Sequence, residues 1–148
     1  MVVIIAILAS LILPRFLAQP ERAIITEAQQ ILGAMRRGEQ NWMDSTDSPT
    51  AGLAVDECGY AAPCANDATW AQIGMTAPAI NARFLFKCDT AGVCTATRKG
   101  PGTVTYADST ITLNYLASAS GGDGHFACGG KYSPVKASGV NDRGCTVS

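Results

Sequence analysis

The sequence predicts an α+β fold in which one long N-terminal α-helix packs on a small antiparallel β-sheet, followed by a C-terminal loop closed by a disulfide. The start of the chain has the pattern of one long helix, first apolar and then amphipathic. Residues 83–115 contain short runs of alternating polar and apolar residues, which are typical of strands joined by turns. Six cysteines follow residue 57, in a chain whose 148 residues allow one small core and an appendage.

We expect three parts. Residues 1–20 form a hydrophobic helix, residues 21–44 form its amphipathic continuation, and residues 45–148 form a globular head. The change in pattern after Pro14 marks the first boundary, and the turn-forming run at residues 44–49 marks the end of the helix.

The apolar start has no charge before Arg15, and its one polar side chain, Ser10, can bond to a carbonyl of its own helix. Fourteen residues cover only about 21 Å of a hydrocarbon core of ~30 Å, so this stretch cannot span a membrane alone. A cleaved signal is disfavoured by the missing basic region, and Ala18-Gln19 is a poor cleavage site because Pro20 follows directly. A plain membrane anchor and a helix used in assembly stay open. The residues that would carry assembly are Met1, Val2, Val3, Ile4, Ile5, Ile7, Leu8, Leu11, Ile12, Leu13, Phe16 and Leu17.

Pro14 lacks a backbone donor and disfavours helix at Leu13, so we expect a bend or a loosened turn there. Pro20 is a second weak point, tolerated if the helix restarts at that position. Glu21 would then favour the restarted helix through its dipole.

The amphipathic part places apolar residues on one face, which we expect to pack on the sheet: Ile24, Ala28, Ile31, Met35 and Trp42. We expect most of its polar residues to be solvated: Glu21, Arg22, Glu27, Arg36, Arg37, Glu39 and Gln40.

Residues 45–66 are expected to form a connecting loop, and residues 66–74 a short helix with Asn66 or Asp67 as its cap. Two strand pairs should follow, residues 83–88 with 93–98 and residues 103–106 with 110–115. The glycine-rich tail from Ala117 is predicted to be loop.

The even number of cysteines in a small glycine-rich domain favours disulfides in an oxidising compartment. Metal binding is disfavoured because both close spacings are C-x5-C and His125 is the only histidine. The missing CxxCH excludes attached c-type haem. Of fifteen possible connectivities we expect the sequential one, with the third bond contributing most, ~2–4 kcal/mol. The pairs are Cys58–Cys64, Cys88–Cys94 and Cys128–Cys145.

We expect no enzyme activity and no cofactor. The sequence has neither a phosphate-binding glycine loop nor a nucleophile elbow, and His125 lies in a glycine-rich loop where a surface position is expected. Asp123 and Asp142 are too few for a calcium site. A net charge of −1 without a basic tract argues against nucleic acid as the principal partner.

The run Met1–Leu11, with Pro14, Arg15 and Phe16 after it, resembles the N-terminus of type IV pilins and of the pseudopilins of type II secretion. The resemblance covers about residues 1–43. The chain departs from the family in having no basic leader, no cleavage site and no glutamate five residues into the mature helix. It also has no glycine before Pro14. Counting back from Pro14, we expect the true start of the helix to lie upstream of Met1.

The resemblance implies a type IV pilin-like fold and a structural subunit of an extracellular helical filament on the bacterial surface. It implies a homo-oligomer held in the inner membrane before assembly, processed by a prepilin peptidase and assembled by pilus machinery. A pseudopilin of type II secretion is the alternative within the family, disfavoured by three disulfides and a long C-terminal loop. The alternative from another class is a membrane-anchored periplasmic binding domain or enzyme. Such a domain has no need of an amphipathic stripe continuing from its anchor.

Overall fold

The computed structural model describes residues 2–100, 105–135 and 143–147, and for residues 10–19 it describes the backbone only. It has an α+β fold with a long N-terminal helix, a five-stranded antiparallel sheet and three disulfides, as predicted. The elements are α1 (Val2–Thr46), β1 (Val55–Gly59), α2 (Asp67–Gln72), β2 (Phe84–Cys88), β3 (Val93–Arg98), β4 (Thr110–Asn114), β5 (Phe126–Gly129), β6 (Tyr132–Pro134) and β7 (Cys145–Val147).

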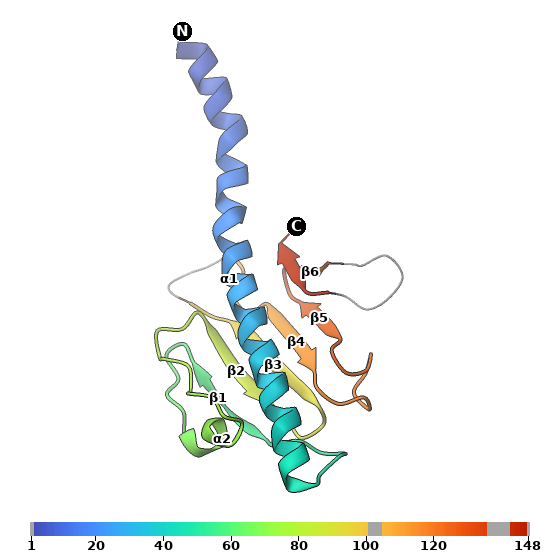
Figure 1. Ribbon diagram of the computed structural model, residues 1–148. Helices are drawn as coiled ribbons and strands as arrows, with labels where there is room; N and C mark the ends of the chain where they lie inside the picture. The colour runs from blue at the N-terminus through green and yellow to red at the C-terminus, as the bar shows by residue number, and fades with distance from the viewer. Residues whose placement is uncertain (1, 101–104, 136–142, 148) are drawn as a thin grey trace.

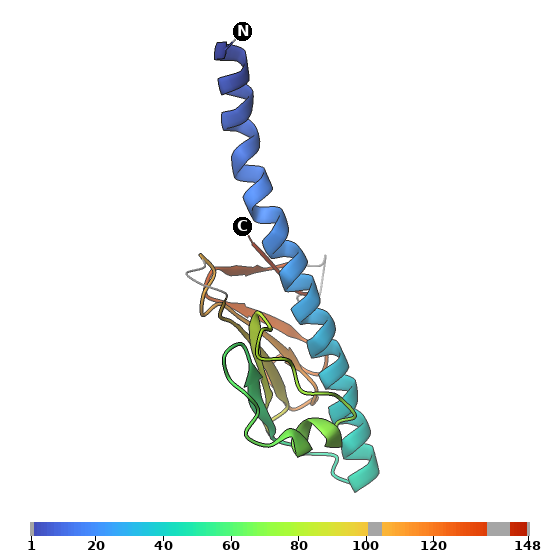
Figure 2. The same cartoon turned by 90° about the vertical axis from the view of Figure 1, so that its left-hand side faces the viewer.

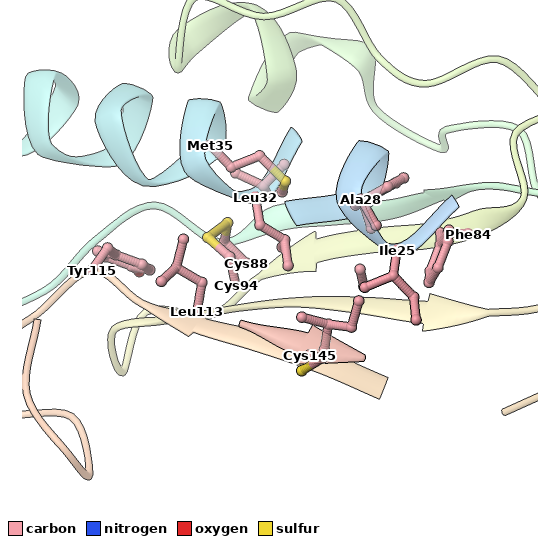
Figure 3. Packing of buried hydrophobic residues seen from close by; sticks show 14 of the residues in the cluster. Ile25, Ala28, Leu32, Met35, Phe84, Cys88, Cys94, Leu113, Tyr115 and Cys145 are labelled. Carbon is pink, nitrogen blue, oxygen red and sulfur yellow. A yellow bond between two sulfur atoms is a disulfide. The ribbon is translucent and has the colours of Figure 1, made fainter. Parts of the chain in front are cut away.

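The C-terminal half of α1 lies across one face of the sheet, whose strand order is β1-β2-β3-β4-β5, while the N-terminal half projects away from the head (Figures 1 and 2). The helix buries Ile25, Ala28, Leu32 and Met35 against the sheet (Figure 3). Ile24, Ile31 and Trp42 are only partly buried. The buried stripe is therefore turned by about one residue from the predicted one, although Ala28 and Met35 belong to both.

The backbone of α1 is helical from Val2 to Thr46, through both Pro14 and Pro20. The loosened turn expected at Pro14 is absent from the described backbone, and Figures 1 and 2 show a gently curved helix. Pro20, the second expected weak point, also lies within the continuous helix, which does not restart there. A proline in a helix removes one hydrogen bond, and the bonds on both sides keep the remaining turns in place.

Sequence reasoning missed β1, which lies within the expected loop 45–66. It pairs with β2 through a bulge between Val55 and Cys58. The outer edge of β1 is covered by α2: the Asp56 N–H donates to Thr69 Oγ1 at 3.2 Å, and Trp70 Nε1 donates to the Asp56 carbonyl at 3.0 Å. These bonds satisfy backbone groups that an open edge strand would offer to another chain. The cap of α2 is Asn66, one of the two candidates from the sequence.

The β2–β3 hairpin forms as predicted, with Cys88 opposite Cys94. The second predicted pair is wrong for Thr105 and Tyr106, which lie in a turn, while residues 103–104 fall outside the described residues. Instead, β4 pairs with β3 on one side and with β5 on the other. The turn is closed by the Ser109 N–H, which donates to the Tyr106 carbonyl at 3.1 Å.

The glycine-rich tail was predicted to be loop, and this was wrong for three short strands. β5 completes the main sheet, and β6 and β7 form a separate ribbon. The disulfides are Cys58–Cys64, Cys88–Cys94 and Cys128–Cys145, which is the sequential pairing favoured by the sequence. The third bond ties β5 to β7. These strands depend on contacts distant in sequence, which local composition does not report.

Two glycines of α1 have different surroundings, and this difference gives a testable prediction. A Cβ at Gly33 would meet only Arg37 Nη1, at 3.9 Å, whereas a Cβ at Gly38 would lie 2.4 Å from the Ile73 carbonyl oxygen. We expect Gly33→Ala to raise the free energy of unfolding by about 0.5–1 kcal/mol, because alanine restricts the unfolded chain. Gly38→Ala should lower it by about 1–3 kcal/mol, because the backbone at Ile73, directly after α2, must move away. Denaturant unfolding of both variants measures this, and equal effects would contradict the packing of Ile73 on α1.

Candidate functional site

The first turns of α1 expose large apolar side chains that a stable domain would bury. We call this segment the apolar tip; its members are Val2, Val3, Ile4, Ile5, Ile7 and Leu8. Their exposed fractions run from 81% at Val2 to 53% at Leu8, whereas Ile25, on the same helix, is 1% exposed. Among the residues of α1 whose side chains are described, Glu21 is the first that is buried by the head. The helix therefore projects by about 28 Å, given a rise of ~1.5 Å per residue.

The apolar tip exposes large side chains at consecutive positions around the helix, without a polar face. A helix that is apolar on all sides is normally buried, since each large side chain withdrawn from water contributes about 1.5–3 kcal/mol. The chemistry available to this site is therefore association with an apolar medium or with other apolar helices. None of the helices in the described part of the chain is both long enough and apolar enough to cross a bilayer.

Six further residues predicted to carry assembly lie outside the apolar tip. Leu11, Ile12, Leu13, Phe16 and Leu17 belong to the stretch described by its backbone only, which is helical. Met1 lies outside the described residues. The structure thus brings the six described members together on one projecting segment.

A buried ionic cluster holds α1 at the point where it leaves the head. We call it the Glu21 clamp; it comprises Glu21, Arg98 and Tyr132. Arg98 Nε donates to Glu21 Oε1 at 2.9 Å, and its Nη2 donates to Oε2 at 3.3 Å. The Tyr132 hydroxyl donates to Glu21 Oε1 at 2.6 Å. Burial and the neighbouring Glu21 carboxylate both raise the pKa of Tyr132, so the hydroxyl keeps its proton for this bond.

The clamp joins three elements that are far apart in sequence: α1, the end of β3 and the start of β6. Arg98 also donates to the backbone carbonyls of Arg83 and Gly100. Glu21 and Arg98 are only 6% and 3% exposed, so the prediction that Glu21 is solvated was wrong. A sequence signal existed at Arg98, because it is in phase with the inward-facing Cys94 and Ala96 of β3.

A second, more exposed contact ties the loop before β5 to α1. Arg36 makes two hydrogen bonds to the Asp123 carboxylate, at 2.8 and 2.7 Å, and Gln40 donates to the same group. The bond from Arg36 holds the pKa of Asp123 below its usual range. Arg36 and Gln40 are thus half-buried instead of fully solvated. His125 is also half-buried, and its Nδ1 finds no hydrogen-bond partner in the described structure.

The described residues contain no group of three or more metal-binding side chains. Asp123 is occupied by Arg36, and Asp142 lies outside the described residues. A shallow groove of about 500 Å³ lies beside α2, and among its lining residues Asp67 is the only one with an ionisable side chain. Cys64, which also lines it, is bonded to Cys58. This lining offers no pair of groups for acid–base catalysis.

Comparisons with protein-family models, with curated proteins and with solved structures find no significant match to this chain.

The Glu21 clamp gives a prediction about stability. Arg98→Met should lower the free energy of unfolding by about 3–5 kcal/mol, because it leaves the Glu21 carboxylate buried without its cation. Adding Glu21→Gln to Arg98→Met should restore part of this loss, since the buried charge is then removed. Denaturant unfolding of the two variants provides the measurement. Glu27→Gln is the matched control, because Glu27 is exposed on the same helix. A loss below 1 kcal/mol for Arg98→Met would contradict the clamp.

Proposed function

We propose that this chain is a type IV pilin-like structural subunit that assembles through its N-terminal helix into an extracellular filament. The observation that carries the proposal is the apolar tip, whose exposed side chains continue directly into a helix fixed on a folded head. The head has its own buried core and three disulfides, so it can fold without other copies. The tip has no such core and needs cover from outside.

The distribution of apolar side chains around the tip favours a bundle over a pair. One partner helix covers a single stripe, whereas side chains of Val3, Ile4 and Ile5 point in three directions around the axis. Cover on all sides is obtained when several copies surround each helix. A head-to-tail contact that does not close produces an open helical fibre, with the tips in its core and the heads outside.

The resemblance of residues 1–16 to pilins adds the rest of the proposal. Before assembly the chain would be held in the inner membrane, processed by a prepilin peptidase and delivered to the pilus assembly machinery. A pseudopilin of type II secretion would use the same helix, and electron microscopy of sheared surface material with mass spectrometry separates the two. Long fibres that contain this chain favour the pilin.

Substitutions at two isoleucines of equal exposure test the role of the tip. Ile4 is 64% exposed on the tip and Ile80 is 62% exposed on the head. We expect Ile4→Asp to abolish fibres, because a carboxylate cannot be buried in an apolar helix bundle. Ile80→Asp, the matched control, should leave them intact. Negative-stain microscopy of sheared fibres from cells that produce each variant gives the result.

Deleting residues 1–20 tests the same proposal by removing the whole projecting part of the helix. The remaining chain begins at Glu21, which is buried by the head, and should be a soluble monomer by sedimentation. Regular fibres formed by this truncated chain would show that the helix is not the core. A monomeric truncated head, together with sheared fibres that do not contain this chain, would point to a membrane anchor instead.

The filament proposal also gives a prediction about Pro14. Pro14 cannot donate to the Ser10 carbonyl, and family resemblance suggests unwinding in this region on assembly. The chain has no glycine between Met1 and Pro14, so we expect unwinding confined to about Ala9–Pro14 with regular helix on both sides. A filament map measures this. Continuous backbone bonding from Ser10 to Leu13, or unwinding that reaches Val3, would contradict it.

A further inference from the structure

Glu39 is a carboxylate buried near the end of α1 that lies furthest from the apolar tip. Its side chain is 0% exposed. Oε2 accepts the N–H of Leu53 at 2.9 Å, while Oε1 is buried and finds no hydrogen-bond partner. Glu39 was predicted to lie on the polar side of the helix, and the structure contradicts this. A buried carboxylate with one unsatisfied oxygen is costly when it is ionised.

The groups that face Glu39 supply no cation. From the β2–β3 turn the facing charge is Asp89, and from the segment after β4 the facing group is the Tyr115 hydroxyl, which donates to the Asp89 carbonyl. On α1 itself, Arg36 is paired with Asp123. No ion pair within the described structure involves Glu39.

The loop of residues 47–54 lies against this site and brings to it the N–H of Leu53. Its one charged side chain, Asp47, is exposed. Gly52 packs so closely on Tyr115 that an added Cβ would lie 2.1 Å from the tyrosine oxygen, and the Gly52 N–H donates to the Thr90 carbonyl at 3.4 Å. The loop is therefore fitted between α1 and the β2–β3 turn. Displacing this loop removes the Leu53 N–H from Glu39, together with the cover that the loop provides.

We propose that Glu39 is a proton-sensitive latch, which holds the loop 47–54 on α1 while its carboxyl is protonated and loosens the loop when it ionises. This inference concerns the head alone, so it does not depend on filament assembly. Burial raises the pKa of Glu39 from 4.5 to about 7, with a further contribution from Asp89. The Leu53 N–H acts in the opposite direction.

The sign of the pH effect follows from proton counting. The folded state keeps the proton up to about pH 7, whereas the unfolded state loses it near pH 4.5. Between these values the folded state binds more protons, so stability falls as the pH rises. The contribution is fully present below about pH 4.5 and is lost through pH 7.

Amide hydrogen exchange of the full-length chain in mild detergent tests the latch. For a pKa change from 4.5 to about 7, protection of the Leu53 amide should fall about 30-fold between pH 5.5 and 8.5, after correction for the intrinsic rate. Glu39→Gln resembles the protonated form and should remove this pH dependence. Glu27→Gln, on the exposed face of the same helix, should behave like the wild type.

Two results would overturn the proposal: constant protection in the wild type, or the same pH dependence in Glu39→Gln. A second measurement needs no variant and so holds even where Glu39→Gln does not fold. The 13C signal of the Glu39 carboxyl in the wild-type chain should titrate near pH 7. A midpoint below pH 5 would show that the carboxylate is ionised in the closed head and would exclude the latch.

Discussion

The burial of one face of α1 against the sheet is the constraint on which the rest of the structure depends. Ile25, Ala28, Leu32 and Met35 are at most 1% exposed and lie between the helix and the strands (Figure 3). At about 1.5–3 kcal/mol for each large side chain, this seam is comparable with the whole net stability of a small domain. It fixes the helix in one rotational position. The direction in which the apolar tip leaves the head is therefore set by packing in the core.

The same face carries a buried glutamate at each end. Counting along the helix from Glu21 through Ile25, Ala28, Leu32 and Met35 to Glu39 gives steps of four, three, four, three and four. This spacing keeps all six residues on one stripe. Glu21 is compensated by Arg98 and Tyr132, and Glu39 is not compensated by any described cation. The cost of burying a carboxylate is therefore offset at Glu21 but not at Glu39, because the surrounding groups differ.

These two glutamates also show where sequence reasoning reached its limit. The existence of the long helix, the β2–β3 hairpin, the short helix with its Asn66 cap and the disulfide pairing could be predicted from local patterns. The stripe was predicted one residue out of phase, because Glu21 and Glu39 were assigned to the polar side by residue type. The alternating steps of four and three residues were the sequence feature that places both glutamates on the buried stripe. No local pattern indicated their partners, since Arg98 and Tyr132 are 77 and 111 residues from Glu21.

The strands that the sequence missed have a related cause. β1 has acidic residues at Asp56 and Glu57, and β5 has a glycine-rich approach, so neither alternates clearly. Each is completed by distant groups: α2 bonds to Asp56, and the Cys128–Cys145 bond joins β5 to β7. Local β-propensity is a weak predictor of a strand whose formation depends on pairing with distant strands or on a disulfide.

The head and the projecting part of α1 differ in whether the protein itself covers their apolar surface. From Glu21 onward, one stripe of α1 is apolar and the sheet covers it, so the head satisfies its own apolar surface. Before Arg15, the sequence carries no charge and Ser10 is its one polar side chain, and within the described side chains the tip is more than half exposed. The single continuous helix α1 joins the exposed apolar part to the part covered by the sheet. Because α1 is continuous and the Glu21 clamp ties it to β3 and β6, the packing of the head fixes the direction in which the tip leaves it.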